Sequence, residues 1–141
     1  MSARRAVPPS LWWLFGLVAL AVAAALLAGA VIYVETQGEA KRRAESISGG
    51  SYAAGRVAIV RYGCGGCHVI PGVTGAVGAV GPSLKAIATR AHIAGRLPNE
   101  PEAMRRWLQH PQAVEPGTGM PELGVTERDA RDMSAYLYTL K

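Results

Sequence analysis

The stretch RYGCGGCHVIPG (residues 61–72) holds both cysteines of the chain and one of its three histidines. Cys64 and Cys67 are separated by two glycines, and His68 follows directly. Residues three apart lie on the same side of a helical turn, so both thiols can face one edge of a bound group. The imidazole of His68 can then turn toward the same group. The pattern C-x-x-C-H is typical of covalent haem attachment.

Three other kinds of site compete with this interpretation. A thiol redox pair needs a strand–helix–strand context, which the sequence does not show, and leaves His68 without a role. A structural zinc site needs four ligands, usually as two pairs, and His92 and His110 lack the required spacing. A disulfide between cysteines this close closes a small loop and stabilises little. Haem attachment through Cys64 and Cys67 is therefore favoured.

A haem iron has two axial positions, and His68 would occupy one of them. Of the four methionines, Met1 begins the chain, and Met104 and Met133 lie in helical patterns as expected core residues. Met120 differs because it lies in PGTGMPELG, a loop rich in proline and glycine. A thioether on such a loop suits a distal ligand. The alternative is a loop methionine packed against apolar neighbours.

Half of the 141 residues are hydrophobic, and many of them gather near the N-terminus. Residues 11–34, LWWLFGLVALAVAAALLAGAVIYV, carry no charge. As a helix they would extend about 36 Å, enough to cross a hydrocarbon layer of about 30 Å with some tilt. Trp12, Trp13 and Tyr33 lie at the two ends, where aromatic residues meet the membrane interfaces. This segment is predicted to be a transmembrane helix.

A cleaved signal peptide is the alternative for this segment. Arg4 and Arg5 would form its basic start, and residues 28–30 (AGA) have the small side chains of a cleavage site. The apolar run continues past that site to Val34, which favours a helix that stays in place as an anchor. Because residues 41–43 (KRR) add positive charge beyond the helix, charge alone leaves its orientation undecided.

The polar segment after the helix, ETQGEAKRRAESISGGS at residues 35–51, has the composition of a linker. In the alternative interpretation, its first half, through Glu45, prolongs the helix. The predicted organisation is an N-terminus at residues 1–10, an anchor helix at 11–34, a linker at 35–51 and a soluble domain at 52–141.

Three segments of the soluble domain have helical patterns. Residues 52–62 are amphipathic and lead into the cysteine motif. Residues 101–110 begin with Pro101 and stop before the next proline, as helices often do. Residues 126–140 begin with Thr126 as N-cap and repeat apolar residues on one side. Since no stretch has a strand pattern long enough to carry a sheet, the predicted fold class is all-α.

Together these features resemble the class I (mitochondrial-type) cytochromes c, over about residues 55–140. The resemblance rests on separated motifs in the family's order: GRVAIVRYGCGGCH, GPSL, TR, PGTGMP and AYLYTL. It implies a small all-α fold around one haem c, bound covalently through Cys64 and Cys67, with His68 and Met120 as iron ligands. The segments HVIPG and PQAVEPGTGMP are most similar to the cytochrome c domains associated with haem–copper respiratory oxidases.

The resemblance also implies roles for three residues around the haem. The carbonyl of Pro82 would accept a hydrogen bond from the second ring nitrogen of His68 and fix its orientation. Arg90 would approach a haem propionate. Trp107 would line the haem pocket.

At the crossing of the first and last helices, the family pattern pairs Gly55 and Ile59 with Ala135, Tyr136 and Leu137. The chain departs from the family here, because Ile59 stands where phenylalanine is frequent. The packing of this crossing is therefore expected to differ.

Ligation by histidine and methionine fills both axial positions and leaves the iron no open site, which favours single-electron transfer. We therefore expect an electron carrier that is not an enzyme by itself, though it could belong to an oxidoreductase complex. The alternative function is a haem-based sensor, or an enzyme subunit, in which a ligand displaces Met120.

By the same resemblance, haem attachment outside the bacterial inner membrane implies a cytoplasmic N-terminus and a periplasmic haem domain. The expected partners are membrane lipid and redox proteins, such as transmembrane subunits of a respiratory or photosynthetic complex. Ala21, Ala25 and Gly29 form a stripe of small residues on the anchor helix that would let such a subunit approach closely. From residue 49 onward, ten Lys/Arg and seven Asp/Glu give a net charge of +3, which gives no support to nucleic-acid binding.

Overall fold

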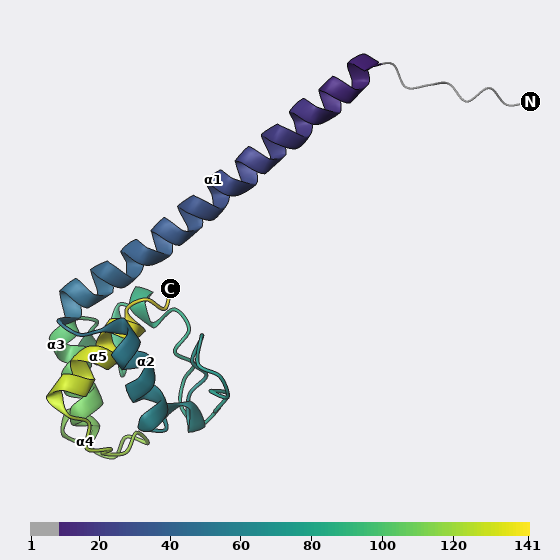
Figure 1. The fold of residues 1–141 in the computed structure, drawn as a ribbon. Helices are drawn as coiled ribbons and strands as arrows, with labels where there is room; N and C mark the ends of the chain where they lie inside the picture. Colours follow the sequence, from purple (N-terminus) through teal and green to yellow (C-terminus); the bar gives the residue numbers. More distant parts are fainter. Residues whose placement is uncertain (1–8) are drawn as a thin grey trace, which may run out of the picture. The chain divides into compact units, whose positions relative to one another are not determined.

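The computed structural model describes residues 9–141, and Figure 1 shows their arrangement. Arg4, Arg5 and the predicted N-terminal segment at residues 1–10 therefore lie largely outside the described residues. The chain divides into two units, Met1–Gly38 and Glu39–Lys141, and helix α1 (Pro9–Ser48) contributes to both.

In the first unit, the apolar side chains of α1 are exposed from Leu11 to Val34. By length and composition this helix can cross a membrane. Large apolar side chains that find no protein to pack against are expected where lipid is the solvent. The fold therefore has the predicted N-terminal membrane anchor.

The second unit begins with the last turns of α1, so the flexible-linker interpretation of residues 35–51 is wrong as far as Ser48. The helical alternative is the observed one, and the helix extends three residues beyond Glu45. Ala44 and Ser48, four residues apart on one helical face, are both almost completely buried. Burial of this face against the rest of the unit explains why a polar segment remains helical.

Two contacts of Tyr52 attach the end of α1 to the start of α2 (Tyr52–Arg61). The Glu45 carboxylate accepts a hydrogen bond of 2.8 Å from the Tyr52 backbone N–H. The Lys41 ammonium lies 4.6 Å from the centre of the Tyr52 ring, a cation–π arrangement. These contacts and the buried face of α1 make residues 39–48 part of the folded unit.

Three helices of the second unit match the predicted ones within a few residues. They are α2 (Tyr52–Arg61), α3 (Pro101–Gln109) and α5 (Glu127–Leu137). The hydroxyl of Thr126 accepts a hydrogen bond of 3.1 Å from the Asp129 N–H, as an N-cap does. Helix α3 has Pro101 in its first turn, as predicted.

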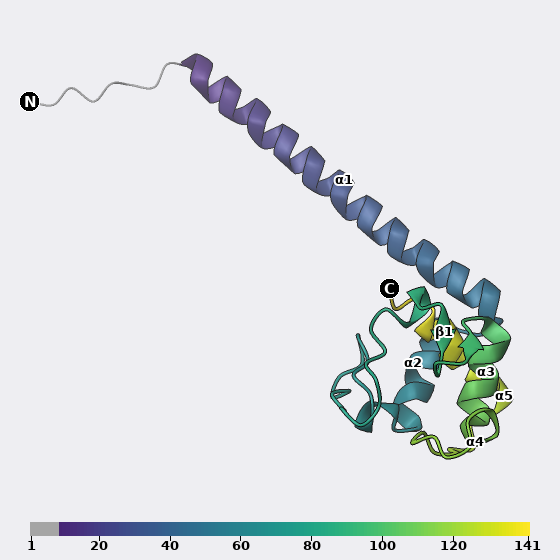
Figure 2. The same ribbon diagram turned by 180° about the vertical axis from the view of Figure 1, so that it is seen from behind.

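Several short elements were not predicted. They are the helix α4 (Pro111–Val114), the 3₁₀ turns η1 (Cys64–Gly66) and η2 (Ile87–Thr89), and the strands β1 (His92–Ile93) and β2 (Leu97–Pro98). The strands pair antiparallel, with Ile93 opposite Leu97. Elements of two to four residues are too short to give a hydrophobic period. The longer elements of the described chain are all helices, in agreement with the all-α prediction (Figure 2).

Helices α2 and α5 cross in direct backbone contact. A β-carbon at Gly55 would lie 1.9 Å from the Asp132 carbonyl oxygen, so only glycine allows this approach. The contact is at Asp132 and Met133, slightly earlier in the helix than the predicted Ala135. Ile59, one turn further along α2, is 1% exposed.

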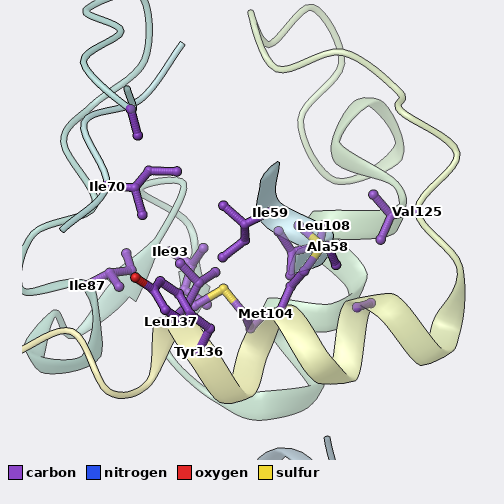
Figure 3. Close-up of a cluster of buried hydrophobic side chains, with 13 residues drawn as sticks. Ala58, Ile59, Ile70, Ile87, Ile93, Met104, Leu108, Val125, Tyr136 and Leu137 are labelled. Atoms are coloured by element: carbon purple, nitrogen blue, oxygen red, sulfur yellow. The ribbon is translucent and has the colours of Figure 1, made fainter. Parts of the chain in front are cut away.

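The hydrophobic core lies against α5, with side chains from α2, α3 and the loops along one side of it (Figure 3). Met104 and Met133 are almost completely buried, which confirms them as core residues. The other buried members of the core are Ala58, Ile59, Ile70, Ala76, Ile87, Ile93, Leu108, Val125, Ala130, Tyr136 and Leu137.

Polar contacts at Asp129 join the ends of α2 and α5. Its carboxylate accepts hydrogen bonds of 2.8 Å from the Tyr62 hydroxyl and from the Thr126 hydroxyl. The Arg61 guanidinium lies 2.6 Å from its other oxygen. These donors, with the Tyr62 hydroxyl the largest cause, lower the pKa of Asp129.

We expect Gly55→Ala to lower the free energy of unfolding by at least about 2 kcal/mol, because the methyl group must push the two helices apart. This loss exceeds the gain of about 1 kcal/mol from the higher helix propensity of alanine. Urea unfolding of the full chain in detergent measures it. Val57→Ala, on the exposed face of the same helix, should change stability by less than about 0.5 kcal/mol. Equal stability of Gly55→Ala and the wild type would contradict the backbone contact.

Asp129→Asn should destabilise the protein at pH 7 and have a smaller effect at pH 3. A carboxyl group whose pKa is lower in the folded state stabilises the fold above its unfolded pKa of about 3.9. That contribution disappears as the pH falls through the folded pKa. The measurement is the difference in unfolding free energy between wild type and variant at the two pH values. A difference that stays constant would show that the Asp129 charge does not contribute.

Candidate functional site

The cysteine motif lies in a tight turn at the end of α2. Gly63 has a left-handed backbone (φ +69°), which ends the helix and turns the chain into η1. The N–H groups of Cys67 and His68 both donate to the Cys64 carbonyl, at 3.2 and 3.0 Å. Both cysteines are partly exposed thiols, and burial raises the pKa of Cys64. The turn thus presents two thiols and an imidazole close together.

The imidazole of His68 is held by the loop that follows the motif. Its Nδ1 atom lies 2.7 Å from the Pro82 carbonyl oxygen, so the predicted hydrogen bond is present. A carbonyl only accepts, so Nδ1 carries the proton and Nε2 keeps a free lone pair in the neutral ring. A β-carbon at Gly81 would lie 2.3 Å from Cε1 of the same ring. The imidazole is therefore packed on one side and free to bind a metal through Nε2.

Arg90 and Asn99 brace this loop with side-chain hydrogen bonds. The Arg90 guanidinium donates to the carbonyls of Ser83 and Lys85, the latter at 3.0 Å. The Asn99 amide donates to the carbonyls of Ile87 and Arg90, at 2.7 and 2.8 Å. A guanidinium has five N–H groups, so Arg90 retains donors for a carboxylate such as a propionate.

Sequence reasoning singled out Arg90 but missed Asn99. Asn99 is the only asparagine in the chain, and it lies between Pro98 and the start of α3. This position in the sequence could have indicated its role, because an asparagine side chain in a loop often makes hydrogen bonds to the nearby backbone. Its Oδ1 atom is buried without a partner among the described residues.

Met120 lies on the loop after α4, partly buried against the core. The Gln112 amide, on α4, donates to the carbonyls of Thr118 and Met120, both at 2.8 Å. Its Oε1 atom accepts from the Gly117 N–H at 3.2 Å. Trp107 is also partly buried against the core. Cys64, Trp107 and Met120 therefore border the same hydrophobic cluster.

Tyr136 connects α5 to the segment just after the motif. Its hydroxyl donates to the Pro71 carbonyl at 2.5 Å, and its ring stacks on Tyr52 with centroids 5.1 Å apart. Burial raises the pKa of Tyr136, and it raises the pKa of Tyr138 to about 12. Both side chains therefore remain neutral phenols at physiological pH, as helix-packing residues do.

These residues fit a covalently attached haem. They supply two thiols on one turn, an imidazole with Nε2 free and a thioether that borders the same core. A β-carbon added at Gly66, between the cysteines, would meet no atom within 4 Å, so the outer side of the turn is open there. A zinc site finds no support, since residues 9–141 contain no group of three or more His, Cys, Asp or Glu side chains arranged to hold a metal ion.

The family model for cytochrome c matches residues 52–141. The chain belongs to the cytochrome c family. A similar protein is the cytochrome c oxidase subunit 2 of Alkalihalophilus pseudofirmus, 36% identical over 88 residues. The match covers 62% of this chain and 25% of that protein, so the chain corresponds to only about a quarter of that relative's length. No solved structure matches the chain significantly.

As a cytochrome c, the protein is an electron-transfer protein with covalently bound haem c. Cys64 and Cys67 are its only cysteines and have the C-x-x-C spacing that attachment requires. The apolar part of α1 makes it a membrane-anchored member of the family. The prediction of a membrane-anchored class I cytochrome c is therefore confirmed.

Gly81→Ala tests whether the His68 imidazole is held by its neighbours. A methyl group at 2.3 Å from Cε1 must displace the ring, so we expect loss of the hydrogen bond to Pro82. The ¹⁵N NMR signal of Nδ1 should shift, and its proton should exchange faster with water. Pro82→Ala keeps the carbonyl acceptor and should leave both observables close to wild type. Unchanged NMR signals in Gly81→Ala would rule out this tight contact.

Proposed function

We propose that this anchored cytochrome passes single electrons through a haem whose iron is bound by His68 and Met120. The observation that carries the proposal is the fixed His68 ring, with Nδ1 donating to Pro82 and Nε2 left to bind iron. When bound, haem supplies an iron that changes its charge by one electron. The hydrogen bond to Pro82 orients the imidazole and increases its basicity.

Met120 is supported as the second ligand by its position. It borders the same core as Cys64 and Trp107, and its loop is attached to α4 through Gln112. A thioether in this position fills the site at which O₂ or peroxide would bind. The protein is then an electron carrier and not an enzyme by itself.

Arg90 and Trp107 are proposed as further haem contacts. Arg90 is half-buried, and its guanidinium is fixed by two carbonyls, which suits a partner for a propionate. Trp107 offers a large, partly buried ring that packs against the same core as Met120. Both roles follow the family pattern at the matching positions.

The proposed location is the bacterial inner membrane, with the N-terminus in the cytoplasm and the haem domain in the periplasm. Covalent attachment of haem c takes place on that side of the membrane in bacteria, which supports this orientation. The similarity to a cytochrome c oxidase subunit 2 supports a respiratory complex as the partner. The small residues Ala21, Ala25 and Gly29 are exposed on α1 and would suit close packing against a transmembrane subunit.

A fixed subunit and a tethered shuttle differ in how they behave during purification. A subunit remains with its complex in mild detergent at moderate salt, whereas a shuttle separates from its partners. Co-purification of the native protein from its own membranes distinguishes the two.

Met120→Ala tests the ligand set. In the wild type we expect haem that resists acid–acetone extraction, and the weak far-red absorption band that methionine–iron ligation gives in oxidised cytochromes c. The reduced wild type should not bind carbon monoxide promptly at neutral pH. Met120→Ala should lose the band and bind carbon monoxide, because the sixth position opens. Met104→Leu, which replaces a buried core methionine at similar volume, should behave like the wild type.

Two outcomes would contradict the proposal. Extractable haem would reject attachment through Cys64 and Cys67. Prompt carbon monoxide binding by the wild type would favour the sensor or enzyme-subunit alternative, in which a ligand displaces Met120.

A further inference from the structure

The side chain of Gln112 uses all of its polar atoms on the loop that carries Met120. Its Nε2 atom donates to the carbonyls of Thr118 and Met120, both at 2.8 Å. Its Oε1 atom accepts from the Gly117 N–H at 3.2 Å. A carboxamide has two donor hydrogens and an oxygen with two lone pairs, so these three bonds use both hydrogens and one lone pair.

The same loop has few other attachments. Pro116, Gly117, Gly119 and Pro121 lie on it with little or no burial, and Gly117 has a left-handed backbone (φ +83°). Prolines have no N–H to donate, and glycines allow many conformations in an open loop. Within the loop, the Thr118 N–H donates to Glu115 at 3.0 Å, and the Met120 N–H makes only a long contact of 3.5 Å with the Thr118 hydroxyl. The Gln112 side chain therefore makes three hydrogen bonds to this loop. Glu122, two residues after Met120, adds contacts of its carboxylate to the Gln112 N–H at 3.2 Å and to the His110 imidazole at 3.8 Å.

The backbone at Gln112 is fixed by its surroundings. The preceding residue, Pro111, is among the most completely buried in the unit. Helix α4 follows α3 after a single residue, His110. An amide on a fixed backbone that bonds three groups of a loop rich in glycine restricts that loop to one conformation.

We propose that Gln112 is a positioning residue that holds Met120 in place to bind the haem iron. This inference rests on the proposed role of Met120 as a ligand. Each hydrogen bond of this kind changes an equilibrium by roughly twofold to tenfold. Loss of the two 2.8 Å bonds should therefore raise the population of the state with Met120 detached by about tenfold or more.

Gln112→Leu tests the inference, because leucine is of similar size and makes no hydrogen bond. In the oxidised full chain, we expect the far-red band of methionine ligation to disappear at a pH about one unit or more below the wild-type midpoint. In the reduced protein, carbon monoxide should bind about tenfold faster at neutral pH. Gln112→Glu is a second variant. It keeps an oxygen that accepts from the Gly117 N–H but replaces the amide N–H₂ with a carboxylate oxygen, which repels the carbonyls of Thr118 and Met120. It should shift both measurements in the same direction.

Glu122→Gln is the matched control. It keeps an oxygen to accept from the Gln112 N–H and leaves the Gln112 side chain untouched, and the charge it removes faces only an exposed His110 at 3.8 Å. Both measurements should therefore match the wild type. Haem content and the thermal unfolding midpoint of each variant show whether the domain is still folded.

The inference is overturned if folded Gln112→Leu and Gln112→Glu keep the wild-type band midpoint and carbon monoxide rate. It is also overturned if Glu122→Gln shifts them equally, since the effect would then follow any change in this loop and not the Gln112 side chain. Failure of the underlying ligand assignment looks different, because the wild type itself would then lack the band.

Discussion

Helices α2 and α5 touch backbone to backbone at Gly55 and Asp132, and the position of the haem motif depends on this contact. Asp132 is buried and also accepts a hydrogen bond of 2.7 Å from the N–H of Ser51, the N-cap of α2. The start of α2 is therefore fixed on α5, and the cysteine turn follows the other end of α2. Tyr136, one turn further along α5, bonds the segment just after that turn. One crossing thus locates both sides of the motif.

The sequence was most informative where a pattern is local. The three longer helices follow from apolar periodicity and from the capping residues Pro101 and Thr126, and the motif around Cys64 follows from residue type and spacing. Prediction failed where long-range packing decides the local structure. Residues 39–48 are helical because Ala44 and Ser48 are buried against other parts of the second unit, which composition does not show.

The side-chain amides were also missed, for a related reason. Asn99 and Gln112 each donate to two carbonyls of a loop, one on the histidine side and one on the methionine side. Such bonds need a donor group beside carbonyls that no helix or strand uses, and only the folded backbone reveals those carbonyls. Both clamps are neutral. Neither amide therefore adds charge to the loop that it holds.

The last turns of α1 change where the functional domain begins. The family match starts at Tyr52, but the compact unit starts at Glu39, and Glu45 caps the N–H of Tyr52 itself. A soluble fragment that begins at Tyr52 would expose the surface that Ala44 and Ser48 cover. It would also lose the cation–π contact of Lys41 with Tyr52, the residue that stacks on Tyr136. A membrane-free version of this cytochrome should therefore begin no later than Glu39.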